Sequence, residues 1–272
     1  MDFFNSLIRW LVEAYVGLFG AAHPLVSLIP LSILVGIGML WVFGKTSDQK
    51  AIARQKKKVQ AYLLELRLFG DDPGLLWKSQ IDLVVGNLRY MGLMLKPALY
   101  LTLPMVVLLF HLDAVYGISA LPVGESAVVT VHASGRLAET AAAPQLEAPE
   151  GVVVETAAMR ALDAGEFSWR VRAQAEAEGE LQFDWNGQSW SKSVTTGDSL
   201  RYVSHNRPTS MLDSLAAPGE PRLAVPQLDS VEIAYPGAEI DFAAYRLHWL
   251  VWFFVVSLVA AYLLKGFFGV TI

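Results

Sequence analysis

The sequence predicts an α-helical membrane protein with three transmembrane helices and a cytosolic helical hairpin, plus an extracytoplasmic all-β, sandwich-like domain. Of the 272 residues, 54% are hydrophobic and only 17% are charged, a balance that water-soluble domains of this length rarely show. Three apolar segments approach the thickness of a bilayer, and the loops between them carry opposite net charges. The longer loop also alternates polar and apolar residues between turn signals, which favours strands.

Residues 1–23 predict an amphipathic helix that lies in the outer membrane interface. Apolar residues recur from Phe3 onward at helical spacing, while Asn5, Arg9 and Glu13 fall on the opposite face. A helix of this kind is expected to anchor the chain at the membrane surface.

Residues 24–44, 97–117 and 246–264 predict the three spans. The first contains 21 residues without a charge, which as a helix reach about 32 Å and match the hydrocarbon core. The residues before it open with Asp2 and lack a basic segment, so the pattern favours a retained span over a cleaved signal peptide.

The distribution of charge predicts the orientation. Residues 45–96 hold ten Lys or Arg against five Asp or Glu, whereas residues 113–246 hold nine against nineteen. By the positive-inside rule the first loop is cytosolic, so the N-terminus lies outside and the tail at 265–272 lies inside. We therefore expect a multi-pass protein of a plasma (inner) membrane, with a bacterial cell as the working assumption.

Residues 45–96 predict a basic helical hairpin whose second arm runs on into the second span. Apolar residues recur at helical period on both sides of Gly70-Asp71-Asp72-Pro73-Gly74, where Asp72 can cap the second helix and Pro73 suits its first turn. The two apolar stripes either bury each other or leave one, with Trp77 and Met91, to receive a client or partner helix.

Three consecutive lysines, Lys56 to Lys58, also allow two interpretations. They set the orientation and form the solvated face of a helix, or they contact anionic lipid or an acidic partner. Nucleic acid is not an expected partner, because no aromatic residues or base-reading motif accompany the charge.

Residues 118–245 predict an acidic, extracytoplasmic β-sandwich domain. Short alternating segments are separated by turn signals, and Asn186-Gly187 is typical of a tight hairpin. The predicted strands cover residues 126–134, 152–156, 166–175, 179–187, 188–196 and 230–237.

The residues that could carry chemistry do not form a recognisable catalytic or metal motif. There is no cysteine, and the five histidines lack metal-ligand spacing, so no metal, cofactor or enzymatic activity is expected. Glu176, Glu178 and Glu180 could supply calcium ligands, although a solvated acidic strand edge is the simpler interpretation. His111 and Asp113 could serve a proton or ion, or could sit among headgroups.

The order of these elements resembles the Oxa/YidC membrane-insertase superfamily. The resemblance is one of topology and covers residues 1–120 and 245–272; segments such as LRLFGDDP, NLRYMGLMLKP and HWLVWFF are also similar to bacterial membrane proteins of unassigned function. The chain departs from the family pattern because it has no mid-span arginine and carries an additional β domain.

The resemblance implies an insertase-like role, in which nascent or partner transmembrane segments enter the bilayer along a polar groove. It implies that client, partner or lipid contacts fall on Lys56, Lys57, Lys58, Arg67, Trp77, Asn87 and Arg89. It implies that Ser27, Ser32 and Thr102 supply the polarity of the groove.

A different class of function is an accessory or scaffold subunit of a membrane complex. In that case the extracytoplasmic β domain docks a protein partner, which explains an acidic exported domain directly. Both functions are non-enzymatic and involve membrane lipid and other membrane proteins.

Overall fold

The computed structural model describes residues 2–19, 22–68, 72–133, 142–161, 163–242 and 245–270, with side chains from Asn5 onward. The chain divides into two compact units. One, the β unit, contains Met1–Ser27 and Val107–Val251. The other, the helical unit, contains Leu28–Val106 and Trp252–Ile272.

Among the residues that the structure describes, two helices are long and apolar enough to cross a membrane. They are α2 (Pro24–Thr46) with 23 residues and α4 (Pro73–Tyr116) with 44 residues. The third predicted span corresponds to α7 (Trp249–Leu264), which has only 16 residues and reaches about 24 Å. It is shorter than predicted because residues 245–247 belong to a strand.

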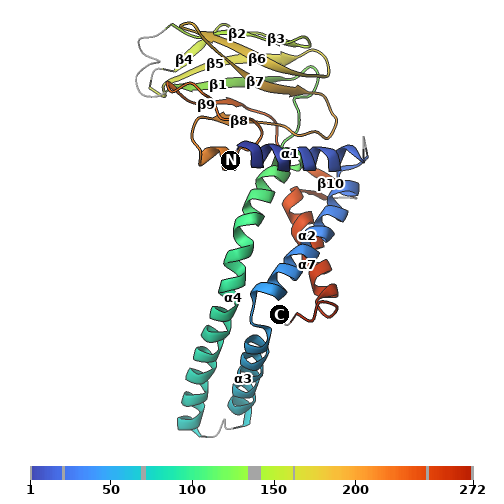
Figure 1. Ribbon diagram of the computed structural model, residues 1–272, viewed down its shortest axis with the longest axis vertical. Helices are drawn as coiled ribbons and strands as arrows, with labels where there is room; N and C mark the ends of the chain where they lie inside the picture. Colours follow the sequence, from blue (N-terminus) through green and yellow to red (C-terminus); the bar gives the residue numbers. More distant parts are fainter. Residues whose placement is uncertain are drawn as a thin grey trace. The chain divides into compact units, whose positions relative to one another are not determined.

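The predicted hairpin is built from α3 (Gln49–Leu68) and the first half of α4, which lie side by side (Figure 1). Gln55 Nε2 donates to the carbonyl oxygen of Gly86 at 3.0 Å and joins the two arms. Asp72 caps α4, because its Oδ1 accepts from the backbone N–H groups of Gly74 and Leu75 at 2.9 and 3.2 Å. The second arm runs without a break into the apolar segment, as predicted; residues 69–71 of the turn lie outside the described residues.

The β unit contains two larger antiparallel sheets. The first has the order β3-β5-β1-β9-β8, with β4 also paired to β5, and the second has the order β2-β6-β7. The strands of the first sheet are β1 (Ser126–Ala133), β3 (Val152–Val154), β4 (Met159–Ala161), β5 (Glu166–Ala173), β8 (Asn206–Pro208) and β9 (Leu228–Ile233). Those of the second are β2 (Gln145–Glu147), β6 (Ala177–Trp185) and β7 (Gln188–Thr196). A separate pair joins β10 (Ile240–Phe242) to β11 (Tyr245–Leu247).

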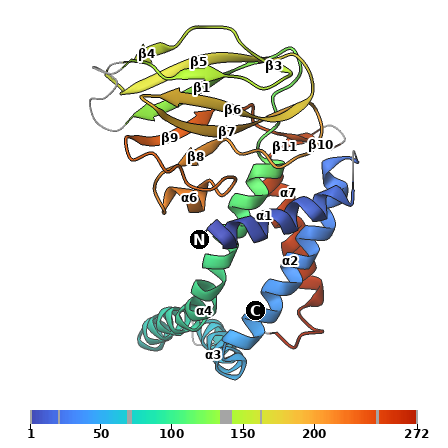
Figure 2. The same cartoon turned by 45° about the horizontal axis from the view of Figure 1, so that its top comes forward.

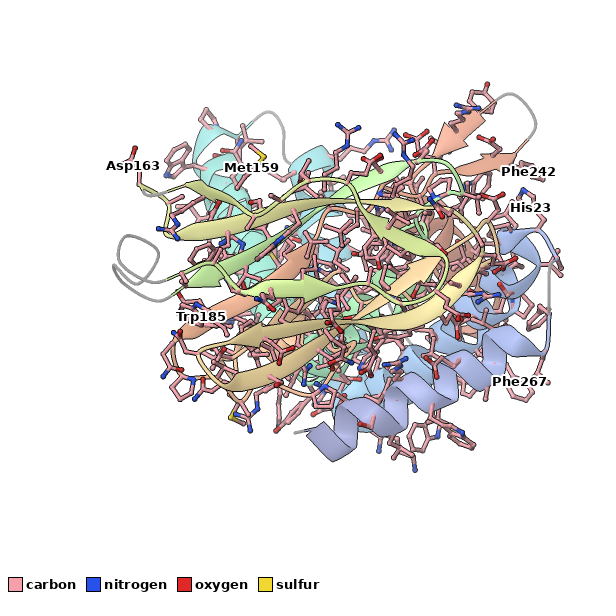
Figure 3. All side chains as sticks on the ribbon, turned by 90° about the horizontal axis from the view of Figure 1, so that it is seen from above. His23, Met159, Asp163, Trp185, Phe242 and Phe267 are labelled. Carbon is pink, nitrogen blue, oxygen red and sulfur yellow. The ribbon has the colours of Figure 1, made fainter. Side chains whose placement is uncertain are left out.

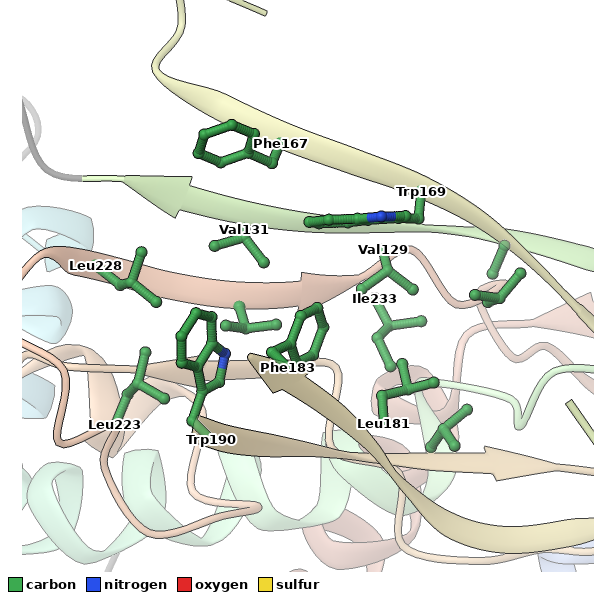
Figure 4. Close-up of a cluster of buried hydrophobic side chains, with 14 of the residues drawn as sticks. Val129, Val131, Phe167, Trp169, Leu181, Phe183, Trp190, Leu223, Leu228 and Ile233 are labelled. Atoms are coloured by element: carbon green, nitrogen blue, oxygen red, sulfur yellow. The ribbon is translucent and has the colours of Figure 1, made fainter. Parts of the chain in front are cut away.

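The buried core of the β unit lies between the two larger sheets. Figure 4 shows Val129, Phe167 and Trp169 of the first sheet above Phe183 and Trp190 of the second. The rings of Phe183 and Trp190 stack with centroids 5.6 Å apart, and Trp169 meets Phe183 edge-on. This is the packing of a β-sandwich, and each of the six predicted strands overlaps an observed one.

Five short strands, β2, β4, β8, β10 and β11, were not predicted. Each has three residues, too few for an alternating pattern to emerge from the sequence. Seen from above, Met159 on β4 and Asp163 lie at one end of the β unit, and Phe242 lies at the other (Figure 3).

Helix α1 (Asp2–Gly17) lies beside the strands of its unit (Figure 2), and its buried face combines Asn5 with Val12 and Val16. Asn5 Nδ2 donates to the carbonyl oxygen of Ser214, on the short helix α6 (Asp213–Ala216), at 3.1 Å. Arg9 donates to the carbonyl oxygen of Gly219. The outward side of α1 is apolar, since Trp10 and Leu11 are 62% and 52% exposed.

Candidate functional site

The outer side of the hairpin presents a row of exposed apolar side chains. The row consists of Trp77, Ile81, Val84, Leu88, Met91 and Leu95 on α4, separated alternately by four and three residues. This spacing keeps all six on one face of the helix, as in the seam of a coiled coil. The opposite face of α4 is turned toward α3, where Ser79 and Gly86 are buried. We call these six residues the apolar row.

A row of basic side chains runs beside the apolar row. Lys78, Arg89 and Lys96 are separated by eleven and seven residues, so they share a face about 100° around the helix from Trp77. All three are exposed. The outer surface of the hairpin therefore combines apolar side chains with positive charge at one edge.

The predicted contact residues of the hairpin fall on several faces. Of the three lysines, Lys57 and Lys58 are exposed and Lys56 is half-buried. By helical spacing Arg67 shares a face with Lys56 on α3. On α4, Trp77 belongs to the apolar row and Arg89 to the basic row. Asn87 lies on the flank of the apolar row that is opposite to the basic row. Asn87 donates to the carbonyl oxygen of Leu83 at 3.1 Å.

The hydroxyl groups predicted to line a polar groove are hydrogen-bonded within their own helices. Ser27 Oγ donates to the carbonyl oxygen of Pro24 and accepts from the hydroxyl of Tyr116 at 2.8 Å. Ser32 is buried and donates to Leu28, four residues earlier. Thr102 is exposed and donates to Ala98 at 2.9 Å. Each hydroxyl thus already donates to a backbone acceptor.

A buried ion pair that the sequence analysis did not identify lies inside the β unit. Lys192 is completely buried, and its Nζ donates to Oε1 of Glu220, whose side chain is 9% exposed. The same Nζ donates to the carbonyl oxygen of Ser204 at 2.6 Å and lies 3.2 Å from its Oγ. Glu220 also accepts from the backbone N–H and hydroxyl of Ser193 at 3.1 and 2.6 Å.

Burial and pairing act against each other on both members of this pair. Burial lowers the pKa of Lys192, and the carboxylate of Glu220 opposes this effect without cancelling it. Burial would raise the pKa of Glu220, but Lys192 and the hydrogen bonds from Ser193 more than offset it, so the pKa is lowered. Glu220 is therefore held as the carboxylate.

A serine beside a lysine amine also raises the question of nucleophilic catalysis. A lysine general base must be neutral to take a proton from a hydroxyl. Lys192 instead directs its protons at a carboxylate, a carbonyl and a hydroxyl oxygen, which is the geometry of a charged ammonium. The cluster is suited to holding β7 against the segments around Ser204 and Glu220.

The sequence does contain a signal for Lys192. Along β7, Trp190, Lys192 and Val194 alternate with less buried neighbours and so point into the sandwich. A lysine in an inward position of a predicted strand requires a buried partner. The alternation was available from the sequence, but the identity of the partner was not, because Glu220 lies in an irregular segment.

The acidic and histidine positions considered in the sequence have protein partners. Glu176 and Glu178 accept from Nη2 and Nη1 of Arg201, both at 2.7 Å. His111 Nδ1 lies 3.0 Å from the hydroxyl of Tyr202, while Asp113 accepts from the indole N–H of a different residue, Trp249. Among the described residues, no group of three or more metal-ligating side chains could hold an ion.

Comparison with known proteins does not add a family or an activity. No protein-family model, no curated protein and no solved structure matches the chain.

Proposed function

We propose that this chain is a non-enzymatic integral membrane protein that acts as an insertase-like protein or membrane-protein assembly factor and receives client helices at its hairpin. The observation that carries the proposal is the apolar row on α4, bordered by Lys78, Arg89 and Lys96. The topological similarity to the Oxa/YidC superfamily points in the same direction.

The physical argument starts from the cost of leaving the apolar row in water. Trp77, Leu88 and Met91 are each more than 60% exposed, and burying one large apolar side chain fully contributes about 1.5–3 kcal/mol. A partner helix with apolar residues at the same alternating spacing would cover the whole row. The basic row would favour acidic side chains or anionic lipid at its edge.

The same proposal includes an orientation. With the basic loop in the cytosol of a bacterial cell, the hairpin would meet nascent chains, and the acidic β unit would lie outside the plasma membrane. Tyr245 and the neighbouring aromatic residues of α7 would then sit at the outer interface.

A second function, that of an accessory or scaffold subunit, is favoured by the hydrogen bonds of the three residues predicted to line a groove. Ser27, Ser32 and Thr102 all donate to backbone carbonyl oxygens of their own helices. A hydrophilic groove needs polar groups that a passing segment can use, and these donors are already engaged. In that case a partner would dock on the β unit, where Val128 and Met159 are exposed on the first sheet.

Site-specific photo-crosslinking in native membranes separates the two functions. Probes would replace Leu88 in the apolar row and Val128 on the β unit, with a probe at buried Ile52 as the control. Crosslinks from position 88 to many nascent membrane chains, with position 52 silent, support the insertase-like function. Crosslinks from position 128 to one stable protein, with position 88 silent, would replace it with the scaffold function.

A further inference from the structure

A cavity in the β unit has a lining that neither function uses. Its volume is about 520 Å³, within the range of small-ligand sites. Arg9 and Glu13 reach it from α1, Glu178 from β6, and Arg201 from the segment after β7. Val115, near the end of α4, contributes part of its apolar wall.

The charged side chains of the cavity are balanced. Arg9 Nε lies 2.7 Å from Oε1 of Glu13, and Arg201 Nη1 lies 2.7 Å from Oε1 of Glu178. A ligand with a net negative charge would be attracted by the arginines and repelled by the carboxylates. A ligand with one negative and one positive group can satisfy both.

Both arginines also retain hydrogen-bonding capacity. A guanidinium carries five N–H donors. Among the described residues, Arg9 directs two of them, at Glu13 and the carbonyl oxygen of Gly219. Arg201 directs three, at Glu176, Glu178 and Ser199. The remaining donors suit the oxygens of a phosphate group, which guanidinium binds with matching geometry.

The connectivity of the chain places the cavity beside the ends of two helices that could cross a membrane. Val115 is the penultimate residue of α4, and Gly17 in the lining precedes the start of α2 by seven residues. Both of these helices are long and apolar enough to cross a membrane. The end of a span is the level of the lipid headgroups. Beside the cavity, α1 exposes Leu11 and Leu18, which suit the acyl boundary.

We propose that this cavity binds the zwitterionic headgroup of a phosphoethanolamine-type phospholipid. Arg201 and Arg9 hold the phosphate, and Glu13 and Glu178 hold the ammonium group. The inference goes beyond the proposed function, because the hairpin belongs to the other unit.

The test is calorimetric titration of the purified full-length chain in a maltoside detergent, which carries neither phosphate nor ammonium. The probes are dihexanoyl phosphatidylethanolamine, dihexanoyl phosphatidylglycerol and glycerophosphoethanolamine. Arg201→Gln removes a phosphate donor, and Leu200→Trp fills the cavity without changing its charge. Arg170→Gln is the matched control, because Arg170 is an exposed arginine paired with Glu155 elsewhere on the β unit.

We expect phosphatidylethanolamine to bind the parent chain and Arg170→Gln equally, and Arg201→Gln and Leu200→Trp at least ten times more weakly. Phosphatidylglycerol should bind more weakly than phosphatidylethanolamine. Glycerophosphoethanolamine should compete with the lipid, because it carries the same headgroup. Direct binding of glycerophosphoethanolamine with no binding of the lipid would reassign the site to a water-soluble phosphoester and overturn the proposal. Equal binding by Arg201→Gln and Arg170→Gln, or a preference for phosphatidylglycerol, would overturn the proposal.

Discussion

Replacing Lys192 by methionine should strongly destabilise the β unit. Methionine keeps the unbranched apolar stem but removes the ammonium, so Glu220 is left as a carboxylate that is 9% exposed, with Arg207 Nε at 4.0 Å as its remaining cation. Removing one partner of a buried ion pair costs about 3–5 kcal/mol, because the remaining charge is desolvated and uncompensated. Since Lys192 is fully buried, solvent screening does not reduce this value.

The change can be measured by thermal unfolding of the full-length chain in detergent, followed by tryptophan fluorescence. Trp169, Trp185 and Trp190 belong to the core of the β unit and report its unfolding. For a folding unit of this size, a loss of 3–5 kcal/mol lowers the Tm by roughly 6–20 °C. Lys57→Met, at an exposed lysine of α3, should leave the Tm unchanged within about 2 °C.

A double variant decides whether the mechanism is the unpaired charge. Lys192→Met with Glu220→Gln removes both charges and leaves an acceptor for the N–H of Ser193. It should recover more than half of the loss. A Tm for Lys192→Met close to that of the parent, or a double variant no better than the single one, would refute the reasoning.

Three further predictions follow from particular residues. The pKa of Glu220 is below its ordinary value of 4.5, so the stability that its carboxylate contributes is present above pH 4.5 and is lost as the pH falls below that value. Below pH 4.5 the Tm of the parent chain should therefore drop more steeply than the Tm of the Lys192→Met, Glu220→Gln double variant. Gly36→Val should destabilise the α2–α7 contact by about 1–3 kcal/mol, because a Cβ at Gly36 would lie 2.7 Å from the backbone oxygen of Ser257. Gly38→Val is the control, because a Cβ at Gly38 meets nothing within 4 Å. Thermal unfolding in detergent compares the two variants. Gly187→Ala should cost about 1 kcal/mol in chemical denaturation, because Gly187 has a φ of +79° in the β6–β7 turn, and a parent-like midpoint would contradict this.

Elements set by local patterns were predictable. The long strands of the sandwich alternate residue by residue, and the Asn186-Gly187 turn adopts the positive φ values that its sequence favours. The cap at Asp72 follows equally from a local rule, since a carboxylate before Pro73 can accept from the first free N–H groups. These features depend on neighbours in the sequence and need no knowledge of distant contacts.

Features that depend on distant segments were not predictable. Helix α1 shows why, since its polar face was identified from periodicity alone. The pattern says that Asn5 and Arg9 avoid an apolar environment, but it does not distinguish water from carbonyl oxygens of a folded domain. In the structure these oxygens belong to Ser214 and Gly219, more than 200 residues away.

The same limit applies to the exposed apolar row of the hairpin. Helical period identifies one apolar stripe on each arm of the hairpin, and only the pairing of α3 with α4 determines whether a stripe is covered or faces outward. Gln55 and Gly86 bring one face of α4 against α3, which leaves the face with Trp77 and Leu88 outward. An exposed row of this length is costly in water, which is the reason for proposing a partner helix that covers it. The chain therefore offers two separate surfaces for testing, the apolar row on one unit and the charged cavity on the other, and a variant in either should leave the other intact.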